Sequence, residues 1–117
     1  MSNLNGLPYT PAVAVDGWVI VSGQLGVRDG VLVEDFAGEV RQVIANLRDR
    51  LVEHGMDLGH VVKTTCFLAD IDQFGEFNEI YAESFPEPRP ARSTVEVARL
   101  PIGANVEIEA LAHRDRT

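Results

Sequence analysis

The alternation of apolar and polar positions begins near the amino terminus, in two short runs rich in β-branched residues. These runs are Ala12–Val15 and Trp18–Ser22, and they flank the dipeptide Asp16-Gly17. A dipeptide of this kind strongly favours a tight turn between two antiparallel strands. The first part of the chain is therefore predicted to form a β-hairpin. A second turn signal, Asp29-Gly30, follows within residues 24–33.

Helical spacing replaces the alternation after Asp35, a residue type that caps helices well. Gly55 is expected to stop this first helix, and the β-branched run Val61–Leu68 is typical of a central, largely buried strand. A second helix is predicted over Asp70–Ser84, and a cluster of prolines ends it. The apolar stripe of the first helix consists of Phe36, Val40, Val43, Ile44, Leu47 and Leu51, that of the second of Ile71, Phe74, Phe77, Ile80, Tyr81 and Phe85.

Strict alternation returns in two runs near the carboxyl terminus, residues 94–98 and residues 106–110. Because two helices can cover only one side of a small sheet, the apolar faces of both runs are expected to pack on the helices and the charged faces to point away. The apolar positions are Val95, Val97, Val106, Ile108 and Ala110; the polar positions are Thr94, Glu96, Glu107 and Glu109, with Arg92 in phase with Thr94 and Glu96.

These elements follow one another in the order β-β-α-β-α-β-β, which predicts an α+β fold with two helices on one face of a mixed sheet. The length of 117 residues suits a single domain, residues 1–117, and a hydrophobic content of 45% is enough for one core. The opposite face of the sheet would be open to water unless copies of the chain associate.

Charge and cysteine content narrow the classes of partner and compartment. The net charge of −8 opposes non-specific attraction to phosphate backbones, so no nucleic-acid partner is expected. No apolar run approaches the roughly 20 residues of a membrane-spanning helix, and no amino-terminal secretion signal is present. The single cysteine, Cys66, excludes an internal disulfide. A cytoplasmic protein without membrane contact is expected.

The segment PARSTVEVARLPIGANVEIEA, residues 90–110, resembles the RidA family, also called YjgF/YER057c/UK114. The resemblance extends through Pro8-Tyr9, residues 21–24, residues 62–65, and Asn78 with Tyr81, in order and spacing. It implies a chorismate-mutase-like fold, a homotrimer whose sheets surround a central barrel, and pockets between subunits. It also implies cofactor-free hydrolysis of 2-imino acids, of the 2-iminobutanoate and 2-iminopropanoate type, to 2-oxo acids and ammonia.

Three residues are implied by this resemblance to carry the chemistry: Arg92, Glu107 and Tyr9. A guanidinium grips a carboxylate with two parallel hydrogen bonds and stays charged at any relevant pH, so Arg92 matches the arginine that binds the substrate carboxylate. Glu107 matches the glutamate that holds the attacking water, and Tyr9 matches the tyrosine that lines the pocket. Near Tyr9 the sequence departs from the family pattern at Leu7 and at Thr10-Pro11.

Four further residues match positions of the family pocket: Ser22, Gly23, Asn78 and Thr94. Gly23 would let the backbone approach a ligand closely. Thr94 stands where many family members have cysteine, and its backbone N–H would still serve a carboxylate. Pocket size and thiol reactivity would change.

Structural roles compete with these functional ones. Arg92 could instead pair with Glu96 or with a neighbouring chain, and Glu107 or Glu109 could pair with Arg99 or Lys63. Spacing alone does not separate Glu107 from Glu109, because both fall on one strand face. Only the family pattern favours Glu107.

Two other functions compete with deamination. A trimeric module that binds 2-oxo acids or similar carboxylates without turnover would use the same arginine. A ribonuclease or translation inhibitor, a label that some relatives carry, ranks third because the chain is acidic and lacks a basic stripe. His54, His60 and His113 share no metal-ligand spacing and no phosphate loop is present, so no metal or cofactor is predicted.

Overall fold

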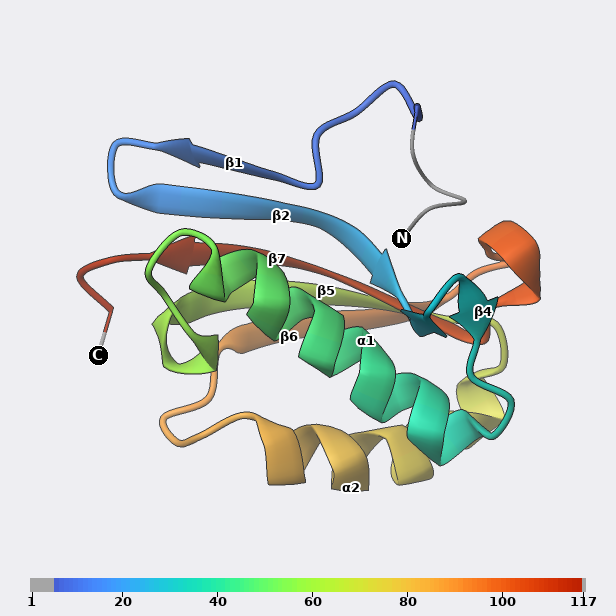
Figure 1. Cartoon of the computed structure of the whole chain (residues 1–117). Helices are drawn as coiled ribbons and strands as arrows, with labels where there is room; N and C mark the ends of the chain where they lie inside the picture. Colours follow the sequence, from blue (N-terminus) through green and yellow to red (C-terminus); the bar gives the residue numbers. More distant parts are fainter. Residues whose placement is uncertain (1–5, 117) are drawn as a thin grey trace.

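A mixed sheet with two helices on one of its faces makes up the structure, a computed structural model that describes residues 6–116 (Figure 1). The elements are β1 (Ala12–Val15), β2 (Trp18–Leu25), β3 (Val27–Arg28), β4 (Val31–Leu32), α1 (Phe36–Val52), η2 (Leu58–His60), β5 (Val61–Leu68), η3 (Ile71–Gln73), α2 (Phe74–Ser84), β6 (Ala91–Glu96), η4 (Pro101–Gly103) and β7 (Val106–His113). The five-stranded sheet has the order β1-β2-β7-β5-β6, and β3 and β4 form a separate small ribbon. The α+β prediction is confirmed.

The hairpin predicted at the amino terminus is present. Asp16 and Gly17, with φ angles of 50° and 83°, form the turn between β1 and β2. Both residues lie in the left-handed region that this type of turn requires. The second strand runs three residues beyond its predicted end at Ser22, because a bulge between Val21 and Gln24 shifts its register on β7 without ending the pairing.

Both predicted helices are present, with a correction to the start of the second. Asp35 caps α1, and its carboxylate accepts a hydrogen bond from the Gly38 N–H at 2.8 Å. The helix ends at Val52, and Gly55 follows in the turn with φ of 76°. Asp70 caps the short turn η3 rather than α2, which begins at Phe74.

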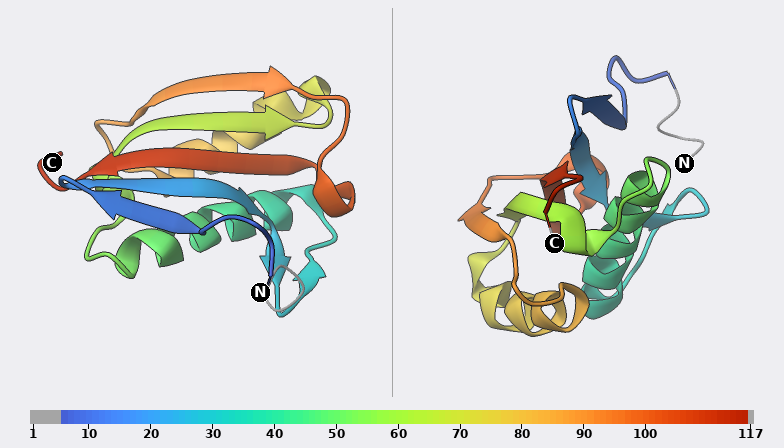
Figure 2. Two further views of the ribbon diagram at one scale, coloured as in Figure 1. Left: turned by 90° about the horizontal axis from the view of Figure 1, so that it is seen from above. Right: turned by 90° about the vertical axis from the view of Figure 1, so that its left-hand side faces the viewer.

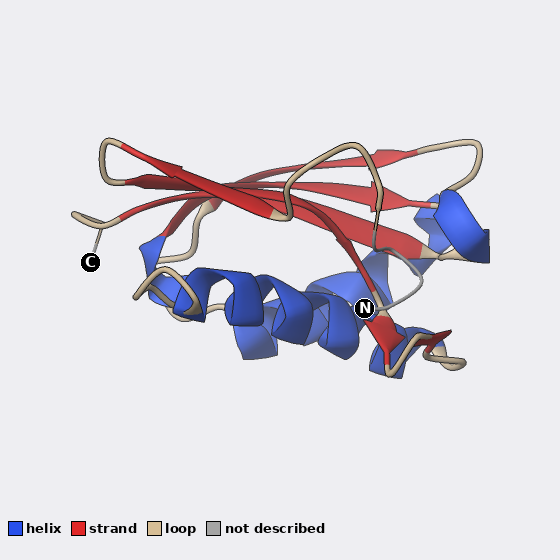
Figure 3. Cartoon of the chain, turned by 45° about the horizontal axis from the view of Figure 1, so that its top comes forward, coloured by secondary structure: helices blue, strands red, loops and turns tan. Residues whose placement is uncertain are grey.

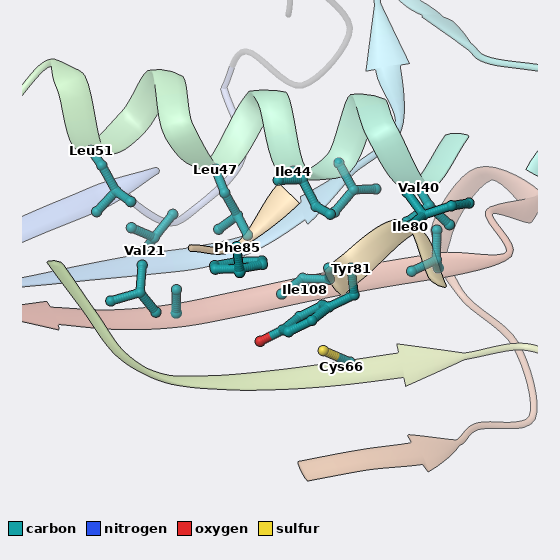
Figure 4. Packing of buried hydrophobic residues seen from close by; sticks show 14 of the residues in the cluster. Val21, Val40, Ile44, Leu47, Leu51, Cys66, Ile80, Tyr81, Phe85 and Ile108 are labelled. Carbon is teal, nitrogen blue, oxygen red and sulfur yellow. The ribbon is translucent and has the colours of Figure 1, made fainter. Parts of the chain in front are cut away.

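The main core lies between the helices and one face of the sheet. Figures 2 and 3 show that both helices lie on this same face. Figure 4 shows α1 side chains above Val21 of β2 and Ile108 of β7. Burying a side chain of this size contributes about 1.5–3 kcal/mol. The fully buried residues of this layer include Val19, Val40, Val43, Leu47, Leu51, Leu68, Phe77, Phe85 and Ile108. No helix within residues 6–116 is long and apolar enough to cross a membrane.

The predicted facing of the two carboxyl-terminal strands is right for β7 and wrong for β6. In β7, Val106, Ile108 and Ala110 join the core, so Glu107 and Glu109 lie on the open face. In β6 the polar positions face the helices: Arg92 contacts α2, and Glu96 accepts a hydrogen bond from the Ile71 N–H at 2.9 Å. The reason is that β6 is the edge strand of the sheet. Polar and aromatic groups of α2 and η3 cover it there, and they suit polar side chains.

Within residues 6–116, no helix lies on the second face of the sheet (Figure 3). Large apolar side chains stand exposed on it in neighbouring strands: Val13, Val15, Trp18, Ile20, Val95 and Leu111 are each between 37% and 50% exposed. The pairs Val13↔Ile20 and Val15↔Trp18, with Ile20↔Leu111, make the β1–β2–β7 part of this set continuous. A contiguous apolar surface of this kind is typical of an interface.

Candidate functional site

Arg92 lies on the helix-facing side of β6, in a surround of aromatic rings supplied by α2. Its Cζ atom is 5.6 Å from the ring centre of Phe74, 5.4 Å from that of Phe77 and 4.8 Å from that of Tyr81. Rings at these distances attract a cation through their negative faces. The guanidinium Nη2 also donates a 2.7 Å hydrogen bond to Oδ1 of Asn78. This is the only hydrogen bond of the guanidinium within residues 6–116. The other guanidinium N–H groups have no hydrogen-bond acceptor within residues 6–116.

The ring closest to Arg92 is itself held in place. Tyr81 shares a 2.7 Å hydrogen bond between its hydroxyl and Thr64 Oγ1, and its ring stacks on Phe85 with centroids 4.4 Å apart. Burial raises the pKa of Tyr81, so the phenol remains neutral. The guanidinium therefore lies against a tyrosine ring that these two contacts hold in place.

Thr94 lies two residues after Arg92 on the same face, opposite Cys66 in the parallel β5–β6 pairing. Its hydroxyl oxygen is buried and makes no hydrogen bond of ordinary geometry within the described part of the chain, although it lies close enough to the Cys66 thiol to lower the pKa of that thiol. Burial raises the pKa of Cys66 to about 11, although the Thr64 hydroxyl and the charge of Arg92 act in the opposite direction. Figure 4 shows this thiol beneath Tyr81, in the core layer. Cys66 is therefore a packing residue in this state and not a nucleophile.

Glu107 lies on the other face of the sheet, beside the bulge of β2. A β-carbon built on Gly23 would overlap the Glu107 carboxylate and would come within 2.7 Å of its Cδ atom. Only glycine leaves room for the carboxylate at this position. Burial, and after it the negative charge of Glu109, raise the pKa of Glu107 above its ordinary value. Glu107 thus has the partly desolvated surroundings that suit a proton acceptor.

The amino-terminal segment runs along β2 toward this bulge. Ser22 donates two hydrogen bonds to it, from its side chain to the Thr10 carbonyl at 2.7 Å and from its backbone N–H to the Pro11 carbonyl at 2.9 Å. The Thr10-Pro11 departure from the family pattern is accommodated, because only carbonyl oxygens are needed there. The side chain of Tyr9 is exposed, with 54% of the residue surface accessible.

The predicted residues thus form two groups on opposite faces of the sheet. Arg92, Asn78 and Thr94 lie on the helix side, whereas Glu107 and Gly23 lie on the open side. Within residues 6–116 Arg92 does not pair with Glu96, which accepts a hydrogen bond from the backbone of η3 instead. Pairing of Arg92 with a neighbouring chain stays a prediction. Within residues 6–116 no salt bridge joins Glu107 or Glu109 to Lys63 or Arg99.

Sequence reasoning did not nominate Phe74 and Phe77 for the site, and assigned both to the apolar stripe of the second helix. Together with Tyr81 they recur at three- and four-residue intervals, which identifies a common helix face but not a cation against it. Sequence reasoning also did not single out Glu39 and Asn105, which form hydrogen bonds with each other. Neither residue belongs to a motif or pattern that predicts a functional role.

Comparison with known proteins finds relatives of this chain both by sequence and by fold. The family description Endoribonuclease L-PSP matches residues 4–114. The chain belongs to this family, which is the YjgF/RidA family. The resemblance read from residues 90–110 is therefore confirmed.

Individual relatives carry more specific names. The chain is 44% identical to the human protein named 2-iminobutanoate/2-iminopropanoate deaminase, over 90% of this chain and 79% of that protein. It is also 44% identical to the chloroplastic Reactive Intermediate Deaminase A of Arabidopsis thaliana, over 90% of this chain and 58% of that protein. A crystal structure of E. coli TdcF with bound serine superimposes with a TM-score of 0.88 at 35% identity, over 92% of this chain and 89% of that chain.

Proposed function

We propose that the chain is a deaminase of the 2-iminobutanoate/2-iminopropanoate type, a cofactor-free hydrolase that converts reactive 2-imino acids into 2-oxo acids and ammonia. The observation that carries this proposal is the guanidinium of Arg92, which Asn78 and three rings hold with further donors free. A fork of donors held in this way suits a small carboxylate. The name of the human relative supports the reaction.

In this proposal Arg92 holds the carboxylate of the substrate and the backbone N–H of Thr94 assists it. The buried Thr94 hydroxyl, which makes no hydrogen bond of ordinary geometry within residues 6–116, is a further donor on the same strand face. Asn78 occupies one guanidinium nitrogen and so orients the remaining donors. Fixing the carboxylate fixes the adjacent C=N carbon, and positioning of this kind is the main contribution that a reactive substrate requires.

Glu107, with Tyr9, would place the attacking water on the C=N carbon. The carboxylate accepts one proton of the water as the water oxygen bonds to that carbon, and passes this proton to the imine nitrogen to give a carbinolamine. The carbinolamine then loses its C–N bond: Glu107 takes the hydroxyl proton and passes it to the amino nitrogen, the C=O bond forms, ammonia leaves, and Glu107 is again a carboxylate. One water is consumed for each 2-oxo acid and ammonia released.

The two groups of residues would meet between copies of the chain. Because Arg92 and Glu107 lie on opposite faces of one sheet, we propose that Ser22, Gly23, Glu107 and Tyr9 of one copy face Arg92, Asn78 and Thr94 of its neighbour. The exposed apolar residues of the open face support association through that face. A homotrimer with the sheets around a central barrel, in the chorismate-mutase-like arrangement, satisfies both requirements.

The test is release of 2-oxo acid and ammonia from 2-iminopropanoate and 2-iminobutanoate, generated in place by an amino acid oxidase while semicarbazide traps free imine. Wild type should outcompete the trap, and Arg92→Ala should not. Equal rates in the two proteins would reject the arginine clamp. No acceleration by a folded wild type would reject the deaminase assignment.

A carboxylate-binding protein without turnover remains the second candidate, because the related E. coli TdcF was crystallised with bound serine. Glu107→Gln separates the two: it should abolish turnover in an enzyme and leave 2-oxo acid affinity almost unchanged in either case. RNA cleavage, which the family description names, is disfavoured by the net charge of −8. An assay with single-stranded RNA under the same conditions tests it directly.

A further inference from the structure

A fully buried carboxylate links α1 to the segment that precedes β7. Glu39 has 0% of its surface exposed, and its two oxygens accept hydrogen bonds from one residue, Asn105. The backbone N–H of Asn105 donates to Oε2 at 2.7 Å, and its side-chain Nδ2 donates to Oε1 at 2.8 Å. A carboxylate is expensive to bury unless such bonds satisfy it. The contact therefore fixes Asn105 relative to the helix.

The same carboxylate side chain also lies against the end of β2. A β-carbon at Gly26, the residue between β2 and β3, would come within 2.6 Å of Glu39 Cγ and 2.7 Å of its backbone oxygen, so the backbone at Gly26 packs directly on Glu39. Two turns further along α1, Asn46 donates to the carbonyls of Leu25 and Val27 at 2.8 and 3.0 Å. The two buried polar residues of α1 thus hold both segments that flank the Glu107 side of the site.

The anchored residues lie next to the proposed water-binding groups in the sequence and in the sheet. Asn105 precedes Glu107 by two residues, and Leu25 is the β2 partner of Glu107 in the register. Gly23, whose missing side chain makes room for the Glu107 carboxylate, lies three residues before Gly26. A shift of either anchored segment would change how the carboxylate lies over Gly23.

We propose that Glu39 is a positioning residue: through Asn105 and Gly26 it sets the Glu107 carboxylate over the bulge of β2, without touching substrate or water. This inference rests on the proposed deaminase function. The Arg92 group lies on β6, at the edge of the sheet away from β2, and no hydrogen bond joins it to Glu39 within the described residues. A disturbed Glu39–Asn105 contact should therefore reduce turnover and leave the binding of carboxylates unchanged.

Three variants test the contact with little change in volume. Asn105→Asp places a second carboxylate against Glu39, and the two repel each other. Glu39→Gln is the conservative control, because the Asn105 amide can turn so that its oxygen accepts from the new amide. The double variant Glu39→Gln/Asn105→Asp restores a complementary pair: the glutamine oxygen accepts the backbone N–H, and its amide donates to the aspartate.

The expected result is a kcat lowered roughly ten- to a hundredfold in Asn105→Asp, close to wild type in Glu39→Gln, and restored to within a few fold in the double variant. The Kd for 2-oxobutanoate, measured by calorimetry, should be the same in all four proteins. An unchanged kcat in folded Asn105→Asp would overturn the inference, and so would a parallel loss of kcat and 2-oxobutanoate affinity that the double variant fails to restore.

A second measurement keeps this result separate from failure of the proposed function. The side-chain carboxyl ¹³C resonance of Glu107, assigned by comparison with Glu107→Gln, reports its surroundings without any turnover. It should move in Asn105→Asp and return in the double variant, even if wild type proves to have no deaminase activity. A resonance that is the same in all variants would reject the positioning role, whereas a wild type without turnover would reject the deaminase assignment.

Discussion

The guanidinium of Arg92 and the carboxylate of Glu107 lie on opposite faces of the same sheet, on strands separated only by β5. The alternation of β7 places Glu107 away from the helices, and the contacts of Arg92 with α2 place it toward them. A single copy therefore has no way to bring both groups to one small substrate. The proposed reaction requires a second copy.

This arrangement predicts that two inactive variants restore each other. Arg92→Ala retains Glu107 and Glu107→Gln retains Arg92, so a mixed oligomer contains sites with both groups intact. In a trimer that contains both variants, about a third of the sites should be complete, because only one of the three contacts between copies then joins an intact Glu107 to an intact Arg92. The measurement is imine hydrolysis by variants co-expressed with different tags and purified for both tags.

The control is each variant expressed alone, which should show almost none of the wild-type acceleration. A mixed oligomer without activity, despite proof that both variants are present, would contradict a site shared between copies.

Replacing Arg92 by lysine should also impair catalysis, although the positive charge is kept. Lysine offers a point charge in place of a planar fork and does not stack against three rings in the same way. We expect kcat/KM to fall roughly a hundredfold, about 3 kcal/mol, mainly through a higher KM. Steady-state kinetics check this, with circular dichroism to confirm the fold. A KM equal to that of wild type would exclude the fork geometry as the source of affinity.

Gly23→Ala should reduce turnover because the new methyl group overlaps the Glu107 carboxylate. The glutamate side chain can rotate away, so thermal stability should change little while kcat falls. Gly75→Ala on α2 is the matched control, because nothing lies within 4 Å of its added carbon. That change should leave kcat unaffected and stabilise the protein by roughly 0.5–1 kcal/mol. Equal activity of Gly23→Ala and wild type would argue against a role for Glu107 at this position.

The raised pKa of Glu107 predicts the pH dependence. Burial is the first cause and the charge of Glu109 the second, and no basic residue among residues 6–116 opposes them. Activity that needs ionised Glu107 should decrease as pH falls through this raised value. Glu109→Gln removes the second cause, lowers the pKa of Glu107, and should move the acid limb of the kcat/KM profile to lower pH. A limb that stays in place would show that another group controls it.

The raised pKa of Glu107 also determines how its contribution to stability depends on pH. A fold that raises the pKa of a carboxyl favours its protonated form, so the contribution of Glu107 to stability is greatest at low pH and decreases as pH rises through the raised value. Glu107→Gln should therefore be at least as stable as wild type at neutral pH. Thermal unfolding of the two proteins at pH 7 checks this, and a clearly less stable variant would contradict it.

Much of the local structure was predictable because the interactions that form it are local. The Asp16-Gly17 turn and the Asp35 cap act on residues within a few positions of themselves. The β7 facing was also predictable, since its apolar residues meet a large helix stripe. The prediction that the second helix begins at Asp70 was wrong, because a capping residue in the sequence does not distinguish a 3-10 turn from the α-helix that follows it.

By itself, the sequence determined the order of elements, the hairpin, the helix stripes and the family pattern that singles out Arg92 and Glu107. Only the tertiary structure decided that Arg92 faces the rings of α2, that Gly23 makes room for Glu107, and that Glu39 holds Asn105, 66 positions away in the chain. Alternation with period two shows which residues share a face, but not which face is covered. Which face is covered depends on the segments that pack against each strand. These segments are distant in the sequence and come together only in the folded protein.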